Sequence, residues 1–294
     1  MREPLRGALF LGTASLLWGV AFVPQAISVE ELDAFWATAL RFLLAAPVAL
    51  VIARGRWRTG VKVHYAVLLG ALLYVAFLLQ TEALRHTPVA RVSLITGTYA
   101  IFTPLLSPLF GLRRPGALHF AGAGVALVGL YALVGGFSAV RAPPNVGDAL
   151  TLGHALLSAV HMILVGQLAP RVEPFAFNAV QLTTMAALAL PTALVVGGPV
   201  DVGALDVRTG LALAYLAVFS SVIAFGCQLF GQRHASPSVS AVVFLLESPI
   251  GAVTAMIALD ERMSPVQVVG ALVLLSGVAL SLRGEVKAAA RAAA

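Results

Sequence analysis

Apolar segments, each about as long as a membrane-spanning helix, follow one another along the whole chain and are separated by short polar connections. A helix needs about 20 apolar residues to cross the hydrocarbon core of a bilayer. The segments are continuous and lack the alternation of barrel strands, the other structure that lipid admits. We therefore predict an all-α integral membrane protein with ten transmembrane helices, near residues 6–28, 34–53, 63–83, 90–110, 117–136, 147–168, 175–197, 209–231, 238–259 and 264–282.

Composition agrees with a protein whose surface faces lipid. The chain is 60% hydrophobic and only 11% charged, whereas soluble domains carry roughly 25% charged residues. The net charge of +6 could indicate nucleic acid. The basic residues lie between the apolar segments, however, so we expect membrane lipid and no nucleic acid as a partner. The single cysteine, Cys227, excludes an intramolecular disulfide.

The distribution of basic residues predicts the orientation, because cytoplasmic loops carry an excess of Lys and Arg. With the N-terminus in the cytoplasm, thirteen of the 19 Lys and Arg residues fall in inside connections and Arg41 falls within a span. The remaining five fall outside: Arg85, Arg91, Arg141, Arg208 and Arg262. Both termini are then cytoplasmic, which requires an even number of spans. The first segment follows basic residues as a signal peptide does, but its length and the nine later spans favour an uncleaved helix.

An internal repeat relates the two halves of the chain. Gly122-Ala123 followed by Gly129 matches Gly270-Ala271 followed by Gly277 at an offset of 148 positions. We predict two five-helix repeats, over residues 1–140 and 141–294. Because five is odd, the second repeat enters the membrane from the opposite side, an inverted arrangement common in secondary transporters. Chance matching in a sequence rich in Leu, Ala and Gly is the alternative.

Ionisable groups within spans are costly in lipid and are therefore functional candidates. Glu247 is the carboxylate predicted well inside a span, and Arg41 is the corresponding basic residue. Glu247 could bind a substrate ammonium or carry a proton, or it could make a structural hydrogen bond. Arg41 could hold a substrate carboxylate through its guanidinium fork, or it could extend toward the interface and cap loop carbonyls.

A polar stripe follows the segment near 147–168. His154, Ser158 and His161 share one helix face. They could line a cavity, join helices by hydrogen bonds, or bind a metal, although no Cys or carboxylate accompanies them. Other polar and aromatic groups within spans suit a cavity with a few polar anchors between apolar walls. These candidates are Trp18, Tyr74, Gln80, Thr96, Tyr99 and Gln228.

Motifs of nucleotide-driven or enzymatic chemistry are missing from the chain. It contains no G-x-x-x-x-G-K-[ST] phosphate loop, no H-E-x-x-H and no C-x-x-C. We expect no cofactor and no enzymatic activity. An intramembrane enzyme acting on lipids and a channel or scaffold are the alternatives to a transporter.

Several residues in both halves resemble a known family. Leu17-Trp18-Gly19 with Phe22, and Arg41-Phe42, are similar to the first two helices of the EamA-type branch of the drug/metabolite transporter superfamily. Near the end, Leu246-Glu247-Ser248-Pro249, the loop Asp260-Glu261-Arg262 and the glycines Gly270 and Gly277 resemble the proline-containing helix, acidic loop and final helix of that branch. One position departs, since Arg113 stands where the first half often has an acidic residue.

The resemblance implies a ten-helix carrier with a central cavity that exports metabolites or amino acids, aromatic ones included, from a bacterial inner membrane. A small-molecule substrate is the expected partner, and a monomer has all that such a carrier needs. The residues above would then contribute to substrate binding: Trp18, Arg41, Tyr74, Gln80, Thr96, Tyr99, His154, Ser158, His161, Gln228 and Glu247.

Overall fold

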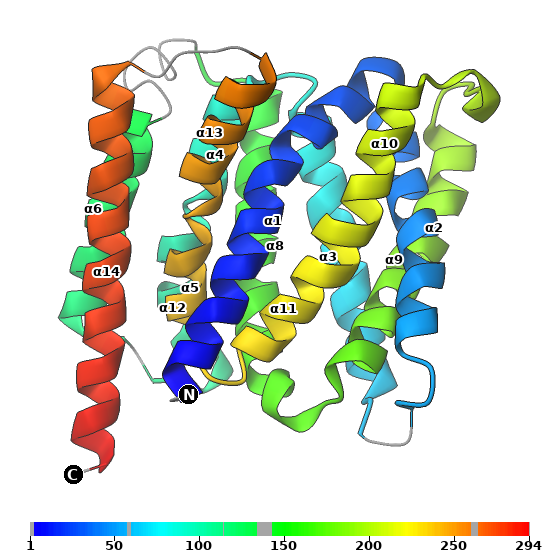
Figure 1. Ribbon diagram of the computed structural model, residues 1–294. Coiled ribbons are helices and arrows are strands. Elements are labelled where there is room, and N and C mark those ends of the chain that lie inside the picture. The colour runs from blue at the N-terminus through cyan, green and yellow to red at the C-terminus, as the bar shows by residue number, and fades with distance from the viewer. Residues whose placement is uncertain (1–2, 58–59, 114, 134–142, 260–263, 294) are drawn as a thin grey trace.

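The chain is a bundle of helices joined by short turns (Figure 1). The computed structural model describes residues 3–57, 60–113, 115–133, 143–259 and 264–293, and no strand occurs among them. The α-helices are α1 (Glu3–Glu31), α2 (Ala34–Ile52), α3 (Val63–Ala83), α4 (Val89–Thr96), α5 (Tyr99–Leu106), α6 (Ala117–Leu133), α8 (Val146–Leu168), α9 (Pro174–Val196), α10 (Val207–Tyr215), α11 (Ala224–Gly231), α12 (Pro237–Phe244), α13 (Glu247–Leu259) and α14 (Pro265–Ala293). A π-helix, η4 (Leu216–Ile223), joins α10 to α11, and the short 3₁₀ helices are η1 (Ser107–Phe110), η2 (Ala169–Arg171) and η3 (Val202–Ala204).

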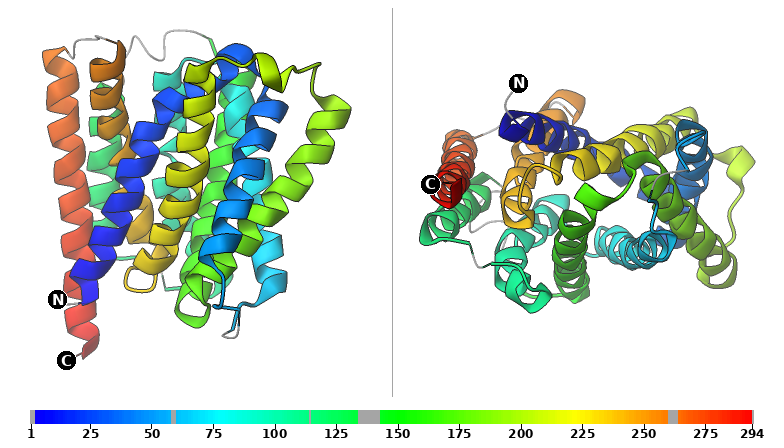
Figure 2. Two further views of the ribbon diagram at one scale, coloured as in Figure 1. Left: turned by 45° about the vertical axis from the view of Figure 1, so that its right-hand side comes forward. Right: turned by 90° about the horizontal axis from the view of Figure 1, so that it is seen from below.

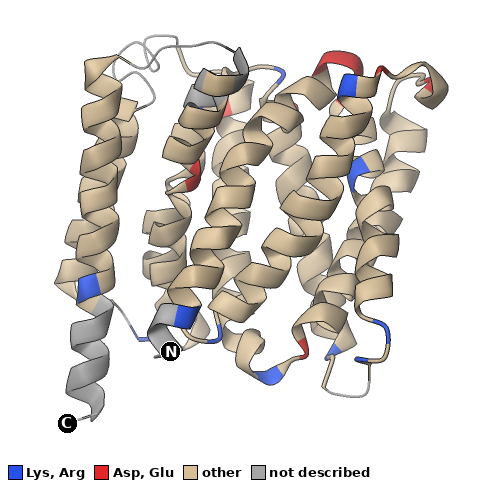
Figure 3. Cartoon of the chain, in the orientation of Figure 1, with Lys and Arg blue, Asp and Glu red and all other residues tan. Residues whose placement is uncertain are grey.

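The helices identify a multi-pass membrane protein. In the described part of the chain, eight helical segments are long and apolar enough to cross a membrane, and two apolar segments, Ala117–Leu133 and Pro237–Gly251, are shorter. Each of the ten predicted spans coincides with one of these segments. Charged residues gather at the two ends of the bundle and leave its middle almost free of charge (Figure 3). Residues 260–263 and Arg141, which the sequence assigned to outside loops, lie outside the described residues.

Three predicted spans are interrupted within their length, a feature that the apolar pattern did not predict. The fourth span changes from α4 to α5 at residues 97–98, and the ninth changes from α12 to α13 at residues 245–246. The eighth span contains the π-helix η4. Such breaks are tolerated within a membrane where the backbone is buried in protein or lines a cavity.

Helices α6 and α14 form a closely packed antiparallel pair at one edge of the bundle (Figure 2). Small residues allow this approach. A Cβ atom on Gly129 would lie 2.2 Å from the backbone nitrogen of Leu274, and one on Gly277 would lie 2.3 Å from that of Ala126. Any side chain at these positions would therefore separate the two helices.

The two largest buried apolar clusters lie on either side of the bundle's polar interior. One joins α1, α5, α6, α8, α11, α12 and α14, and the other joins α2, α3, α9, η4 and α11. Trp18 packs against both clusters. The polar side chains described next lie between them.

Candidate functional site

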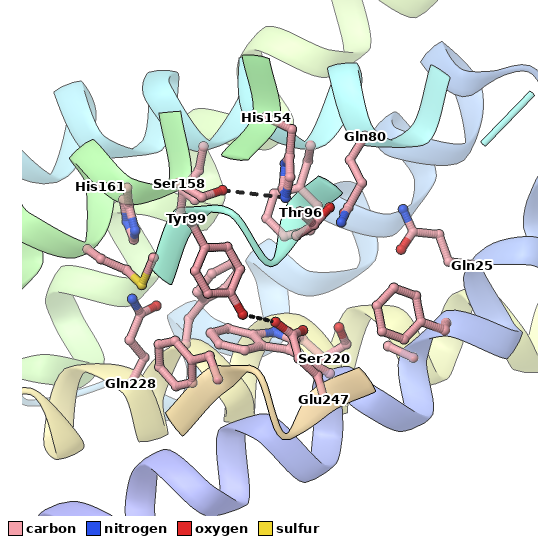
Figure 4. A pocket seen from close by; sticks show the side chains of 18 of the residues that line it. Gln25, Gln80, Thr96, Tyr99, His154, Ser158, His161, Ser220, Gln228 and Glu247 are labelled. Carbon is pink, nitrogen blue, oxygen red and sulfur yellow. Dashed lines mark hydrogen bonds between the residues drawn. The ribbon is translucent and has the colours of Figure 1, made fainter. Parts of the chain in front are cut away.

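A cavity of about 80 Å³ lies in the middle of the bundle and is bordered by all three interrupted spans (Figure 4). Its walls come from α1, α2, α3, α4, α5, α8, η4, α11, α12 and α13. The lining residues are Trp18, Ala21, Phe22, Gln25, Arg41, Leu73, Phe77, Gln80, Thr96, Tyr99, His154, Ser158, His161, Met162, Ser220, Phe225, Gln228, Phe244 and Glu247. Ten of the eleven residues proposed from sequence border this one space; Tyr74 does not.

Glu247 and Tyr99 face each other across the cavity (Figure 4). Each is the first residue of the half-helix that follows a break, α13 and α5 respectively. The Tyr99 hydroxyl donates a hydrogen bond of 2.5 Å to Oε1 of Glu247. The N-terminus of a helix carries a partial positive charge, which stabilises an anion there. Oε2 of Glu247 has no hydrogen-bond partner in the described part of the chain, so this oxygen can accept a donor from a ligand.

Arg41 supplies the opposite charge to the cavity wall. Its Nε donates to Oγ of Ser221 at 2.9 Å, and its Nη2 donates to Oγ of Ser220 at 3.0 Å. Its Cζ atom lies 4.5 Å from the ring centroid of Phe77, a cation–π distance. Arginine has five N–H donors, so two bonds to serine leave donors for a carboxylate. The alternative of an Arg41 side chain extended to the interface is wrong, because the residue is only 4% exposed inside the bundle.

The π-helix η4 supplies both serines that accept hydrogen bonds from Arg41. Its wide turn places Ser220 and Ser221 side by side toward α2, and its carbonyl at Ser220 accepts the Trp18 indole N–H at 2.9 Å. Trp18 also packs edge-on against Phe225 and Phe244. The indole N–H is therefore engaged, and Trp18 presents apolar ring surface to the cavity. Single π-helical turns in helices occur frequently at functional sites.

The polar stripe of α8 borders the cavity, and both of its histidines make hydrogen bonds to neighbouring groups. Nδ1 of His154 lies 2.9 Å from the carbonyl of Ala76, and its Nε2 lies 3.5 Å from Oγ of Ser158. Because the carbonyl only accepts, Nδ1 is the donor, and a neutral ring then accepts at Nε2. Nε2 of His161 lies 3.4 Å from Oε1 of Gln181. Among the described residues no group of three His, Cys, Asp or Glu gathers as a metal site would require.

Three further polar groups border the cavity with unused hydrogen-bonding capacity. Oγ1 of Thr96, at the end of α4, is buried and lacks a hydrogen-bond partner among the described residues. Gln80 lies on the same side of the cavity as Gln25, whose Nε2 donates to Oγ1 of Thr81 at 3.3 Å. A buried polar atom without a partner costs free energy, so Thr96 is well suited to contact a polar ligand.

Tyr74 lies away from the cavity, and the amide of Gln228 is engaged with another protein side chain. On α3, Leu73, Phe77 and Gln80 face the cavity at helical spacing, and Tyr74 lies about 100° around the helix from Leu73. Its hydroxyl instead lies 2.5 Å from Oγ1 of Thr192 on α9. Gln228 does border the cavity, but its Nε2 donates to Oε1 of Gln232 at 3.0 Å.

The sequence analysis missed two polar lining residues, Gln25 and Ser220. Gln25 stands beside Pro24 within an apolar segment, and this isolated amide in a span was a usable signal. Ser220 carried no comparable signal, because serine is common in membrane helices and a π-helix has no distinct sequence pattern. The sequence pattern also did not predict that Phe22, Phe77 and Phe225 form the apolar walls, since apolar residues occur on every face of these helices.

Known proteins resemble this chain over most of its length. An uncharacterized transporter of Archaeoglobus fulgidus is 26% identical over 93% of this chain and 96% of its own. A probable amino-acid metabolite efflux pump of Escherichia coli strain K12 is also 26% identical, over 92% of each chain. One crystal structure superimposes with a TM-score of 0.79 and 20% identity, covering 94% of this chain and 96% of its own, a likeness that concerns the fold alone.

The sequence model of the EamA-like transporter family matches this chain twice, over residues 5–135 and 145–283. The two matches cover most of the sequence and include every helix that borders the cavity. The chain therefore belongs to the EamA-like transporter family, within the drug/metabolite transporter superfamily.

Proposed function

We propose that the protein is a secondary transporter that exports small metabolites, above all amino acids and including aromatic ones, by alternating access through the central cavity. The observation that carries this proposal is the dipolar lining of the cavity. Glu247 and Arg41 border the same space, and an amino acid is a zwitterion that carries one charge to match each of them. The carboxylate binds the ammonium group, and the guanidinium binds the carboxylate.

The names of two relatives support this substrate class. Both the Escherichia coli protein and a Salmonella typhimurium protein, each 26% identical to this chain, are named probable amino-acid metabolite efflux pumps. Phe22, Phe77 and Phe225 add apolar surface for a side chain. Because about 80 Å³ holds only a small solute, an aromatic amino acid requires the helices around the cavity to part further.

An inverted repeat would supply the motion. Gly122 and Gly270 are 148 positions apart, and so are Tyr99 and Glu247, the residues that follow the two breaks. Discontinuous helices at corresponding positions of two halves are typical of transporter binding sites. We propose repeats over residues 1–140 and 141–294, ten spans, and a cytoplasmic location of both termini. The antiparallel packing of α6 against α14 and the two family matches support this arrangement.

The proposal requires that one side of the cavity close while the other opens. Several hydrogen bonds cross between helices at the end of the bundle near the N-terminus. Nε2 of Gln232 donates to the Met162 carbonyl at 2.9 Å, and Nε2 of Gln167 donates to the Phe110 carbonyl at 2.6 Å. These bonds between side chains and backbone join neighbouring helices at this end, and we propose that they break when the cavity opens there.

Counterflow in proteoliposomes tests this function. Vesicles that contain the purified protein are loaded with one unlabelled amino acid, and uptake of the labelled form is measured for a panel of amino acids. We expect saturable uptake that the internal substrate accelerates, and an imposed pH gradient then distinguishes coupled from facilitated transport. Uptake that neither saturates nor responds to internal substrate would favour a channel. Absence of uptake together with chemical change of the vesicle lipids would favour an intramembrane enzyme.

A further inference from the structure

A second cavity, of about 190 Å³, lies near the N-terminal end of the bundle and is separate from the central one. It lies between α1, α2, α9 and the segment formed by η4 and α11. Its lining residues are Phe10, Ala49, Ile52, Phe175, Asn178, Val222, Ile223, Gly226, Cys227 and Phe230. Ile52 and Ile223 are each 38% exposed on the outer surface of the bundle, so the cavity adjoins the space that acyl chains occupy.

The cavity has an aromatic wall with arginines beside it. Phe230 stacks on Phe10 with ring centroids 5.2 Å apart and meets Phe175 edge-on at 5.3 Å. The guanidinium of Arg56 lies 3.9 Å from the Phe175 centroid, and that of Arg233 lies 5.4 Å from the Phe230 centroid. Positive charge therefore lies directly beside the apolar space.

Two arginines at this end are available to an anion. Arg6 precedes Phe10 by four residues and so shares its face of α1. Arg6 and Arg56 are exposed, and neither guanidinium group makes a hydrogen bond or ion pair within the described residues. Glu173 is the nearby carboxylate, and its Oε2 is occupied by the Ala176 N–H at 2.6 Å. The rim thus attracts a negatively charged group.

Asn178 gives the cavity one polar atom that needs a donor. The residue is 3% exposed, and its Nδ2 donates to the Val222 carbonyl at 2.9 Å. Its Oδ1 is buried and has no hydrogen-bond partner among the described residues. A purely hydrocarbon occupant would leave this oxygen unsatisfied, whereas a hydroxyl near a lipid headgroup would supply the donor.

We propose that this cavity binds an anionic phospholipid, with an acyl chain in the apolar space and the phosphate against Arg6 and Arg56. Phosphatidylglycerol has the required negative charge and headgroup hydroxyls. With the orientation proposed above, the lipid belongs to the cytoplasmic leaflet, but the site itself does not depend on that orientation. Basic residues near a membrane surface contribute about fivefold each to the binding of anionic lipid, so the two arginines together contribute about 30-fold.

The site shares a wall with the substrate cavity. Val222 and Ile223 of η4 border the lipid cavity, while Ser220 of the same π-helix borders the central cavity and accepts a hydrogen bond from Arg41. An occupant that packs against Val222 therefore stabilises the turn that holds Arg41. Transport should then be faster in vesicles that contain anionic lipid.

Native mass spectrometry of the full-length protein in detergent tests the binding. Phosphatidylglycerol and phosphatidylcholine with identical acyl chains are added to wild type and to two variants. Gly226→Leu fills the cavity, because a Cβ at Gly226 meets nothing within 4 Å. Gly210→Leu is the matched control, since its Cβ also meets nothing within 4 Å and it lies on α10 away from the cavity.

We expect wild type and Gly210→Leu to retain one phosphatidylglycerol about 30-fold more tightly than phosphatidylcholine. Gly226→Leu should lose this bound lipid, and a chain with both Arg6→Gln and Arg56→Gln should bind the two lipids alike. Equal retention of phosphatidylglycerol by Gly226→Leu and wild type would overturn the proposal, as would no preference for the anionic lipid in wild type.

The single cysteine allows a second test in the unmodified chain. Cys227 borders the lipid cavity, so a bound lipid should shield its thiol. We expect N-ethylmaleimide to label wild type more slowly in vesicles that contain phosphatidylglycerol than in vesicles of phosphatidylcholine alone. Equal labelling rates would contradict occupancy of the cavity. Neither test uses a transport substrate, so their failure is distinct from failure of the proposed transport function.

Discussion

Replacement of Glu247 by glutamine tests how the central cavity binds an ammonium group. The amide has nearly the same shape as the carboxylate and can still accept the hydrogen bond that Tyr99 now donates to Oε1 at 2.5 Å. What disappears is the negative charge on Oε2, which has no protein partner among the described residues. Glu247→Gln therefore separates recognition of charge from local packing.

The expected size of the effect follows from the contact that is lost. A hydrogen bond to a charged group contributes about 1.5–3 kcal/mol, and 1.36 kcal/mol corresponds to a factor of ten. The KM for an amino acid should therefore rise about 10- to 150-fold in Glu247→Gln. The same acid without its amino group never had the ammonium contact, so its apparent affinity should change by less than about threefold.

The assay is counterflow of a labelled amino acid, with unlabelled amino acid and its deaminated analogue as competitors. Tyr99→Phe is the control, because it removes the hydroxyl but keeps the Glu247 charge and the aromatic ring. We expect this variant to raise KM less than Glu247→Gln does. The reasoning is refuted if Glu247→Gln weakens both competitors by the same factor, since the carboxylate would then support the fold and not the ammonium group.

Three further predictions concern the rest of the molecule. Arg41→Lys should raise KM for amino acids about tenfold but leave the affinity for the decarboxylated amines unchanged, because lysine lacks the guanidinium fork; an equal loss for both would argue against carboxylate binding. Gly277→Leu should destabilise the chain by about 1–3 kcal/mol, seen as a lower Tm, whereas Gly124→Leu should not, because a Cβ there meets nothing within 4 Å; similar Tm values would contradict this packing. In a cysteine-free chain, an impermeant maleimide applied to whole cells should label Val202→Cys and spare Trp57→Cys, and the reverse result would invert the orientation.

The membrane class and the location of the long apolar helices could be predicted from sequence because lipid imposes a simple demand on each segment. About 20 apolar residues in a row leave one main interpretation. The interruptions could not be predicted in the same way. Leu245 and Leu246 continue the apolar run of residues 241–244, and the break between α12 and α13 depends on how the surrounding helices pack. The π-helix η4 is likewise a tertiary feature with no periodic signal.

The candidate site was predictable to the extent that polar groups are rare within spans. Arg41, His154 and Glu247 stood out because lipid penalises them, and all three border the central cavity. Direction around a helix was harder to predict. Tyr74 and Phe77 both lie in an apolar helix without a polar face, so the sequence did not reveal that α3 directs Phe77 toward the cavity and Tyr74 toward Thr192.

The central claim is that one cavity is reached from each side of the membrane in turn, and cysteine accessibility tests it most directly. Ser158 borders the cavity, and its one hydrogen bond, to His154, is 3.5 Å long, so Ser158→Cys in a Cys227→Ser chain should be tolerated. A small impermeant thiol reagent is applied from the inside or the outside of oriented vesicles. We predict labelling from both sides and slower labelling from each side when an amino acid substrate is present. Labelling from one side alone, or labelling that substrate does not slow, would contradict the account.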